Sequence, residues 1–258
     1  MSLHDRSAPV HVHETVGSTN DLALELATHG AADFTAVLAD QQTAGRGRRG
    51  RTWWSPPGAG LYLSVIVRPG GNVSHVPLLT LAAGVALAEA TRAVTGVAAE
   101  LKWPNDLVVG RPWRKLAGIL CEASGLGTPA AAVVVGMGLN LRRSAYPDDI
   151  ADRVTSLSEE CPYDVERDVM ASAVLEALER QVTALREGQA GVVLDAWRGL
   201  ANTALDRAPV RWKDADGDHR GTTMGVADDG ALLVREPGQE TVTRIVSGEV
   251  VWEMLTRE

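Results

Sequence analysis

The sequence contains one unusual stretch, QQTAGRGRRGRTWW, at residues Gln41–Trp54. It places four arginines within the seven residues Gly45–Arg51, although the formal net charge of the chain is -8. The basic character is therefore local, and general affinity for nucleic acid or anionic membranes is not expected. Glycines allow the backbone to approach a ligand closely, and guanidinium groups bind phosphate oxygens two at a time. The stretch predicts a phosphate-binding loop; an Arg-Gly nucleic-acid tether and a solvated basic loop are the alternatives.

The arginine loop does not have the Walker A pattern, which requires G-x-x-x-x-G-K-[ST]. It suits a multiply charged ligand such as a nucleoside triphosphate. Its four like charges repel one another. We therefore expect the loop over residues 44–54 to be mobile without a polyanion, because its charges would then lack partners.

The residues around this loop predict a mixed α/β domain. A helix is expected to begin at Ser18 as N-cap, with Asp21 as capping-box acid, and to stop at Gly30. Further helices are expected over residues 74–94, 164–188 and 191–205. Strands are expected over residues 35–40, 60–69, 98–103, 106–110, 114–124 and 130–140.

A composition change near residues 205–209 predicts a second, smaller domain. The turn signals DADGD, ADDG and PGQ follow about ten residues apart and separate short β runs. This spacing is typical of a small antiparallel barrel. We therefore expect a mixed α/β domain over residues 1–204 and a small β domain over residues 205–258.

Composition narrows the class of protein. Hydrophobic residues make up 45% of the 258 residues and charged residues 22%, as expected for a globular protein. Cys121 and Cys161 give neither a disulfide framework nor metal-ligand spacing, and Cys121 is expected to be a buried reduced thiol. No signal peptide or membrane-spanning run is recognised, so we expect a soluble cytoplasmic protein.

Two further segments combine polar groups with apolar strands. In KWPNDLVV, Asn105 and Asp106 form either an ordinary turn or a pair of site groups. In RKLAGIL, Lys115 lies in a predicted apolar strand. Buried lysines are uncommon unless a partner group pairs with them. Gly118 is expected on the same side as Lys115, where it would leave room for a ligand.

The segment VVVGMGLN ends a predicted strand with Gly136, Gly138 and Asn140. It is a poor dinucleotide-binding fingerprint, because the third glycine is missing and no helix pattern follows. It is either a glycine-rich strand end or a platform for a ligand.

Taken in order, Ser18-Thr19-Asn20, QQTAGRGRRGR, KWPND, KLAGIL and GMGLN resemble the biotin protein ligase family. The motifs stand in register over residues 16–141. The resemblance implies an α+β fold: a class II aminoacyl-tRNA synthetase-like catalytic domain, a mixed sheet with flanking helices, followed by a C-terminal SH3-like β-barrel. Some members carry an N-terminal DNA-binding domain. Because the motifs begin by Ser18, this chain resembles the monofunctional class that lacks it, and no DNA partner is expected.

The resemblance also implies a reaction. Biotin, the substrate, is activated by ATP with Mg²⁺ to biotinyl-5′-AMP, and the biotinyl group passes to a lysine of a biotin carboxyl carrier protein domain of an acyl-CoA carboxylase. No tightly bound prosthetic group, resident metal or membrane partner is implied. The sequence does not distinguish a monomer from a homodimer. A lipoate-type ligase of the same fold, or a nucleic-acid-binding module, is the alternative reading.

Site residues follow from the resemblance position by position. Biotin contacts are implied for Ser18, Thr19, Asn20, Gln42, Gly45, Arg46, Gly47, Lys115 and Gly118. Contacts with ATP or the adenylate are implied for Arg46, Arg48, Arg51, Trp53, Asn105, Lys115 and Asn140. Catalytic roles are implied for Lys115, Arg46 and Asp106. Lys115 would bridge the biotin carboxylate and the α-phosphate, Trp53 would stack on adenine, and Asp106 would orient Lys115 or accept a proton from the carrier lysine. Trp54 and Trp113 lie beside the motifs without an assigned role.

Overall fold

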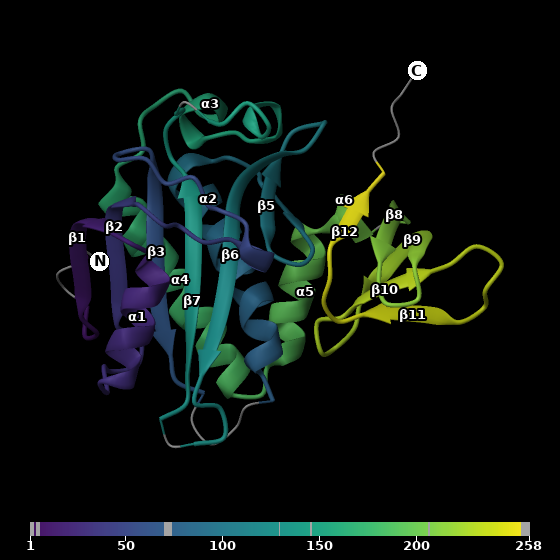
Figure 1. Cartoon of the computed structure of the whole chain (residues 1–258), viewed down its shortest axis with the longest axis horizontal. Helices are drawn as coiled ribbons and strands as arrows, with labels where there is room; N and C mark the ends of the chain where they lie inside the picture. Colours follow the sequence, from purple (N-terminus) through teal and green to yellow (C-terminus); the bar gives the residue numbers. More distant parts are fainter. Residues whose placement is uncertain are drawn as a thin grey trace.

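A seven-stranded mixed sheet forms the main body of the protein (Figure 1). The computed structural model describes residues 3, 6–69, 74–128, 130–144, 146–205 and 207–253. The strand order is β1-β2-β3-β7-β6-β5-β4; β1 and β2 are parallel, and the other neighbours are antiparallel. The strands are β1 (Val10–Val16), β2 (Ala36–Gln42), β3 (Gly60–Val67), β4 (Glu100–Lys102), β5 (Asp106–Val109), β6 (Arg114–Ser124) and β7 (Ala132–Asn140). The six strands predicted for this region are confirmed.

Strand β1 was not predicted. It lies at the edge of the sheet, where only β2 pairs with it, and most of its side chains are half-buried or exposed. Its sequence, VHVHETV, therefore lacks the continuous apolar run that marks the central strands β3 and β7. The partnership with β2 decides its conformation.

Helices cover both faces of the sheet, and the alternation of side chains along each strand assigns residues to each face. Val37, Ile66 and Val134 pack against α1 (Thr19–Thr28) on one face. The other face carries the larger core, built with α2 (Leu79–Thr95), α4 (Arg167–Arg186) and α5 (Ala190–Leu200). Figure 1 shows α1 in front of the strands and α2 and α4 behind them.

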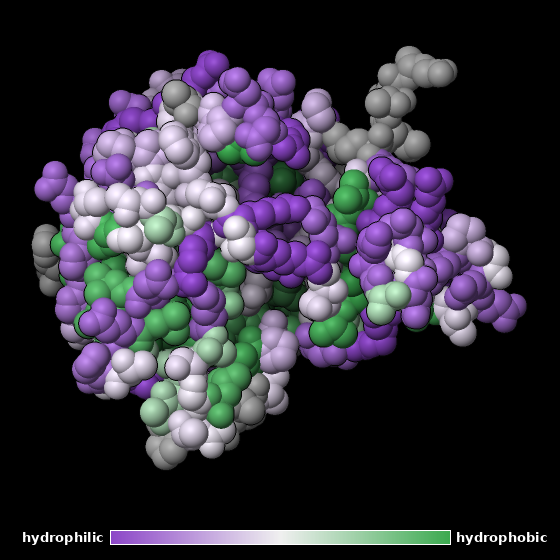
Figure 2. Space-filling model, in the orientation of Figure 1, coloured by the Kyte–Doolittle hydropathy of each residue, from purple (hydrophilic) through white to green (hydrophobic). Residues whose placement is uncertain are grey.

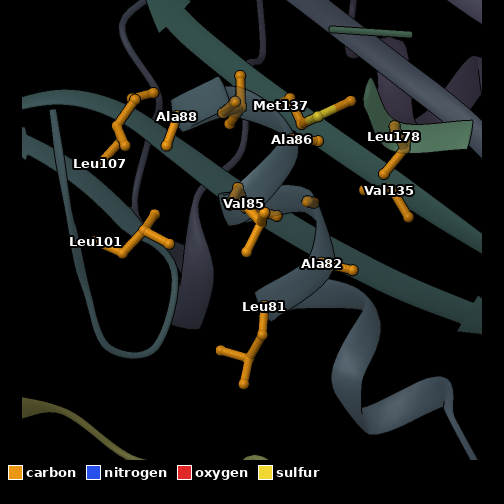
Figure 3. Packing of buried hydrophobic residues seen from close by; sticks show 14 of the residues in the cluster. Leu81, Ala82, Val85, Ala86, Ala88, Leu101, Leu107, Val135, Met137 and Leu178 are labelled. Carbon is orange, nitrogen blue, oxygen red and sulfur yellow. The ribbon is translucent and has the colours of Figure 1, made fainter. Parts of the chain in front are cut away.

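Helix α2 is the central helix of the larger core (Figure 3). The helix predicted over residues 74–94 begins later, after a 3₁₀ turn at Val76–Leu78, and Gly96 ends it with φ = 74°. The combined segment Val76–Thr95 is long and apolar enough to cross a membrane, but 72% of its apolar 18-residue window is buried inside the fold. Its apolarity is explained by packing against the sheet, α4 and α5.

The start of α1 differs from the predicted capping box. Ser18 occupies the N-cap position but makes no side-chain capping bond. Instead, Gln42 Oε1 accepts the Thr19 N–H at 2.9 Å, so β2 caps the helix. Asp21 is paired with Arg46 at 2.6 Å rather than with the backbone. The predicted stop at Gly30 is confirmed by its positive φ of 83°.

A separate five-stranded antiparallel sheet follows, in the order β11-β10-β9-β8-β12. Its strands are β8 (Pro209–Lys213), β9 (Asp218–Val226), β10 (Leu232–Arg235), β11 (Val242–Ile245) and β12 (Val250–Trp252). Two tryptophans tie it to the main body: Trp103 Nε1 donates to the Gly230 carbonyl at 2.9 Å, and Trp252 Nε1 donates to the Ala204 carbonyl at 3.2 Å. The remaining short elements are Arg48–Gly50, Ala151–Arg153, α3 (Leu157–Glu160) and α6 (Asn202–Leu205). The helix predicted over residues 191–205 is thus divided into α5 and α6.

Candidate active site

A cleft of about 890 Å³ opens on the face of the sheet that carries α1. Its walls come from the arginine loop, strands β5, β6 and β7, the segment 146–154, and residues 248–252, which comprise β12 and the end of the loop before it. Figure 2 shows a hollow on this side of the molecule, bordered by hydrophilic residues. Segments far apart in the sequence therefore meet around one space.

Nearly all the predicted site residues line this cleft. They are Ser18, Thr19, Asn20, Gln42, Arg46, Gly47, Arg48, Arg51, Trp53, Asn105, Asp106, Lys115, Gly118 and Asn140, and Trp54 and Trp113 line it too. Gly45 is the exception: it is buried outside the lining, where a Cβ would lie 2.6 Å from Ser55 Oγ. Gly45 is therefore required for packing at the base of the loop rather than exposed to the cleft.

Lys115 and Asp106 form an ion pair inside the cleft. Their Nζ and Oδ1 atoms are 2.5 Å apart, and the side chains are 31% and 23% exposed. Residues three apart on a regular strand point to opposite faces, so Lys115 and Gly118 should be separated. A β-bulge changes this: Gly118 pairs with Asp106 but Lys115 pairs with Val108, which leaves an extra residue on β6. The predicted common side is confirmed, since a Cβ at Gly118 would lie 3.1 Å from Lys115 Cε.

Trp53 fills the space that two glycines leave open. Gly118 and Gly138 are cross-strand partners. A Cβ at Gly138 would lie 2.4 Å from Trp53 Nε1, and one at Gly118 would lie 3.0 Å from the same indole. Lys115 Nζ stands 5.3 Å from the centroid of the Trp53 ring, within cation–π range. The GMG segment is thus a platform for the indole, and the indole in turn forms part of the cleft surface.

The arginine loop has partners, so the reason given for its expected mobility is wrong. Arg46 pairs with Asp21 at 2.6 Å and Glu122 at 2.7 Å, and Arg51 pairs with Glu249 at 2.5 Å. The sequence did not reveal these carboxylates because they come from α1, β6 and the loop between β11 and β12. They neutralise part of the loop charge without any ligand.

Arg48 is the arginine best placed for an anion. Its Nη1 donates to Asn105 Oδ1 at 3.3 Å, a neutral partner. Burial lowers the pKa of Arg48, and the neighbouring Arg49 lowers it further. An anion beside Arg48 would oppose both effects, because negative charge nearby favours the charged guanidinium.

A buried polar network occupies the end of the cleft near α1. Thr19 Oγ1 and its N–H both donate to Gln42 Oε1, at 3.0 and 2.9 Å. Ser64 Oγ lies 2.7 Å from Thr19 Oγ1 and 2.6 Å from Asn20 Oδ1. Ser64 was missed, although one hydroxyl in the otherwise apolar strand GLYLSVIV is a signal that could have identified it. This end offers neutral donors and acceptors suited to an uncharged polar ring.

The two asparagines hold neighbouring segments in place. Asn105 Nδ2 donates to the Ile119 carbonyl at 2.8 Å, which leaves Oδ1 for Arg48. Asn140 Nδ2 donates to the Thr155 carbonyl at 2.9 Å and so helps to fix the segment whose Val154 pairs with the backbone of Lys115. Asn105 is thus both part of a turn and part of the site surface, which combines the two alternatives for KWPND.

The cleft also contains groups that were not predicted, which come from β4, from the loop before β12 and from β12 itself. Lys102 Nζ lies 5.2 Å from the Trp252 ring centroid, and burial lowers the pKa of Lys102. The hydrogen bond from Arg51 lowers the pKa of Glu249. In the part of the chain that the structure describes, no group of three or more His, Cys, Asp and Glu residues could hold a metal ion. The lining of the cleft is thus rich in arginine, lysine and neutral polar side chains rather than in groups of metal ligands.

Comparison with known proteins connects this geometry to a family. The profile described as the Biotin/lipoate A/B protein ligase family matches residues 12–140. The biotin–[acetyl-CoA-carboxylase] ligase of Paracoccus denitrificans is 34% identical over 232 residues, 87% of this chain and 93% of that protein. The enzyme of the same name from Mycobacterium tuberculosis is 33% identical over 244 residues, covering 91% and 85%. A solved structure, biotin protein ligase from Aquifex aeolicus in complex with biotin and ATP, is similar with a TM-score of 0.79 and 28% identity, covering 94% of this chain and 97% of that one.

Proposed function

This chain belongs to the biotin/lipoate A/B protein ligase family, and on that premise we propose that it activates biotin with ATP and transfers it to a carrier protein. It is a ligase of the biotin–[acetyl-CoA-carboxylase] type. The names of its relatives favour biotin over lipoate. The carrier would be a biotin carboxyl carrier domain of an acyl-CoA carboxylase.

The convergence of Lys115, Arg48 and the polar network on one cleft carries this proposal. In the first step a biotin carboxylate oxygen attacks the α-phosphorus of ATP. The bond between the α-phosphorus and the bridging oxygen breaks, and pyrophosphate leaves with Mg²⁺, which enters with ATP as part of the substrate. Both reactants are anions that repel each other, so fixed cations between them lower the barrier.

Lys115 would hold the two reacting groups together. Its ammonium lies on the floor of the cleft, anchored by Asp106 at 2.5 Å and by the Trp53 ring. An ammonium that is already oriented needs no reorganisation when charge develops on the phosphate. The ion pair favours the orienting role for Asp106 in this step.

The two ends of the cleft would bind different parts of the substrates. The neutral network of Ser18, Thr19, Asn20 and Gln42 suits the ureido ring of biotin, with Gly47 above it and Gly118 beside it. The nucleotide would lie toward Asn140 and the segment 146–154, with Arg48 and Arg51 on its phosphates and Trp53 against adenine. This division follows the chemistry of the lining residues, neutral at one end and cationic in the middle.

In the second step the amine of the carrier lysine attacks the carbonyl carbon of the anhydride. A new amide bond forms, the carbonyl–phosphate oxygen bond breaks, and AMP leaves. The amine must lose a proton as it reacts, and Asp106, 23% exposed in the cleft, could receive it.

We also propose the finer architecture. Residues 1–204 would form a class II aminoacyl-tRNA synthetase-like catalytic domain and residues 205–258 an SH3-like domain, consistent with two separate sheets. The protein would act in the cytoplasm.

The test is replacement of Lys115 by Ala. We expect biotinyl-5′-AMP formation, measured by pyrophosphate release, to fall by at least about 10²–10³-fold, the usual effect of removing a preorganised group that stabilises developing charge. Lys213→Ala, at an exposed position on β8, is the control and should retain the wild-type rate. Wild-type pyrophosphate release from Lys115→Ala would overturn the role of this lysine. A wild-type protein that forms lipoyl-AMP, but no biotinyl-AMP, would show that biotin is not the substrate.

A further inference from the structure

One carboxylate oxygen connects the proposed biotin end of the cleft to the arginine loop. Glu122 Oε2 accepts a hydrogen bond from Asn20 Nδ2 at 2.7 Å and another from Arg46 Nη2, also at 2.7 Å. Glu122 lies near the end of β6, whereas Asn20 is on α1 and Arg46 is in the loop. Two groups from different elements therefore share a single acceptor atom.

Asn20 cannot change its hydrogen-bond partners without affecting the residues around it. It is only 4% exposed, and a Cβ at Gly136 would lie 2.1 Å from its Oδ1, so the side chain fills its site tightly. Its Nδ2 also donates to the Leu120 carbonyl at 3.2 Å, which together with Glu122 uses both amide hydrogens. A ligand that takes a hydrogen bond from Asn20 must therefore share or replace one of these acceptors. Glu122 is the movable one, because Leu120 contributes a backbone carbonyl.

Asp21 provides an internal comparison. Its Oδ1 lies 2.6 Å from the same Arg46 Nη2, as close as Glu122, but the described contacts of Asp21 do not include Asn20. Both carboxylates hold the arginine loop by charge. Only Glu122 also touches the polar network.

We propose that Glu122 is a positioning residue that couples occupation of the biotin subsite to anchoring of the arginine loop. The inference rests on the proposed function. A ligand that accepts the Asn20 Nδ2 hydrogen in place of Glu122 leaves Oε2 entirely to Arg46, and the charge-assisted bond to the loop strengthens. Biotin binding thus fixes the loop before the nucleotide phosphates arrive. Arg46 acts as the anchor, while Arg48, Arg51 and Lys115 remain for the phosphates.

Hydrogen exchange of the backbone amides of residues 45–52, measured with and without biotin and in the absence of ATP, tests this coupling. In the wild type we expect biotin to slow exchange by roughly tenfold, the effect of a strengthened hydrogen bond to a charged group. In Glu122→Ala the slowing should fall below about twofold, whereas Asp21→Ala should keep it. Glu122→Gln retains a carbonyl oxygen that can accept from both donors and should restore part of the slowing.

The possible results distinguish a failure of the coupling from a failure of the proposed function. Equal loss of the biotin effect in Glu122→Ala and Asp21→Ala, or its retention in both, would overturn the coupling, as would a wild-type loop that biotin does not slow. Thermal unfolding verifies that each variant is folded, and Glu122→Gln carries the test if the alanine variant is not. Calorimetric titration with biotin isolates the other failure: a wild type that does not bind biotin overturns the proposed function, and this inference with it.

Discussion

Replacing Gly138 by Ala tests how closely the sheet and the cleft are fitted together. Gly138 lies on β7, and a Cβ there would stand 2.4 Å from Trp53 Nε1 and 2.5 Å from Trp53 Cε2. Nonbonded carbon contacts are most favourable at about 3.5–4.0 Å, so the indole would have to retreat by about 1 Å. The Trp53 backbone opposes this movement, because its N–H donates to the Gly45 carbonyl at 2.9 Å and its own carbonyl accepts from Ser55 Oγ at 3.0 Å.

Gly138→Ala is expected to lower both the stability of the protein and the rate of its reaction. Overpacking of this kind destabilises a protein by about 1–3 kcal/mol. For a chain of this size each 1 kcal/mol lowers the melting temperature by about 2–4 °C, so we expect a decrease of about 2–12 °C. Trp53 also forms the surface beside Lys115, and a displacement of about 1 Å near reacting groups can cost about 10²-fold in rate.

Gly199→Ala is the matched control for Gly138→Ala. Gly199 lies in α5 with nothing within 4 Å of the position of a Cβ. Alanine should stabilise this exposed helical site by up to about 1 kcal/mol. The measurements are thermal unfolding, tryptophan fluorescence and the rate of biotinyl-AMP formation. If Gly138→Ala behaves like Gly199→Ala in all three, the glycine platform does not position Trp53, and our account of the GMG segment is wrong.

Two predictions concern groups outside the cleft. His219 Nε2 lies 2.9 Å from Asp214 Oδ1, and this hydrogen bond raises the pKa of His219; its contribution to stability is therefore complete below the ordinary pKa and is lost as pH rises through the raised value. Between pH 6 and pH 8 the melting temperature of the wild type should fall more than that of His219→Gln, and parallel curves would contradict this assignment. Cys121 is half-buried rather than fully buried as expected, and burial raises the pKa of its thiol to about 11, so only about 0.1% of the thiol is ionised at pH 8. Iodoacetamide should label Cys121 much more slowly in the native protein than in the unfolded one, as read by mass spectrometry, and equal rates in the two states would contradict the raised pKa.

The sequence was most informative where local chemistry decides structure. The central strands β3 and β7 are continuous apolar runs, and α2 is rich in Ala and Leu, so their burial follows from composition. The edge strand β1 has no such pattern, because a strand that pairs on one side only need not be apolar. Predictions therefore succeeded in the core and at the β4 edge of the sheet, and failed at the β1 edge.

The candidate site divides in a similar way. The spacing of charged and small residues identified Lys115, the arginine loop and the glycines, whose chemistry is unusual wherever they occur. Ser64, Glu122 and Glu249 carry ordinary signals in sequence and become site groups only through their neighbours in space. Long-range pairing decides which carboxylate meets which arginine.

The sequence by itself determined the chemical inventory: a local excess of cations, a lysine in an apolar strand, and glycines at the ends of strands. Only the tertiary structure decided which carboxylates neutralise these cations and in which direction the side chains point. The β-bulge puts Lys115 and Gly118 on one face, and strand pairing brings Asp106 within 2.5 Å of the ammonium. Charges interact through space rather than along the chain, so their partners are set by the packing of distant segments.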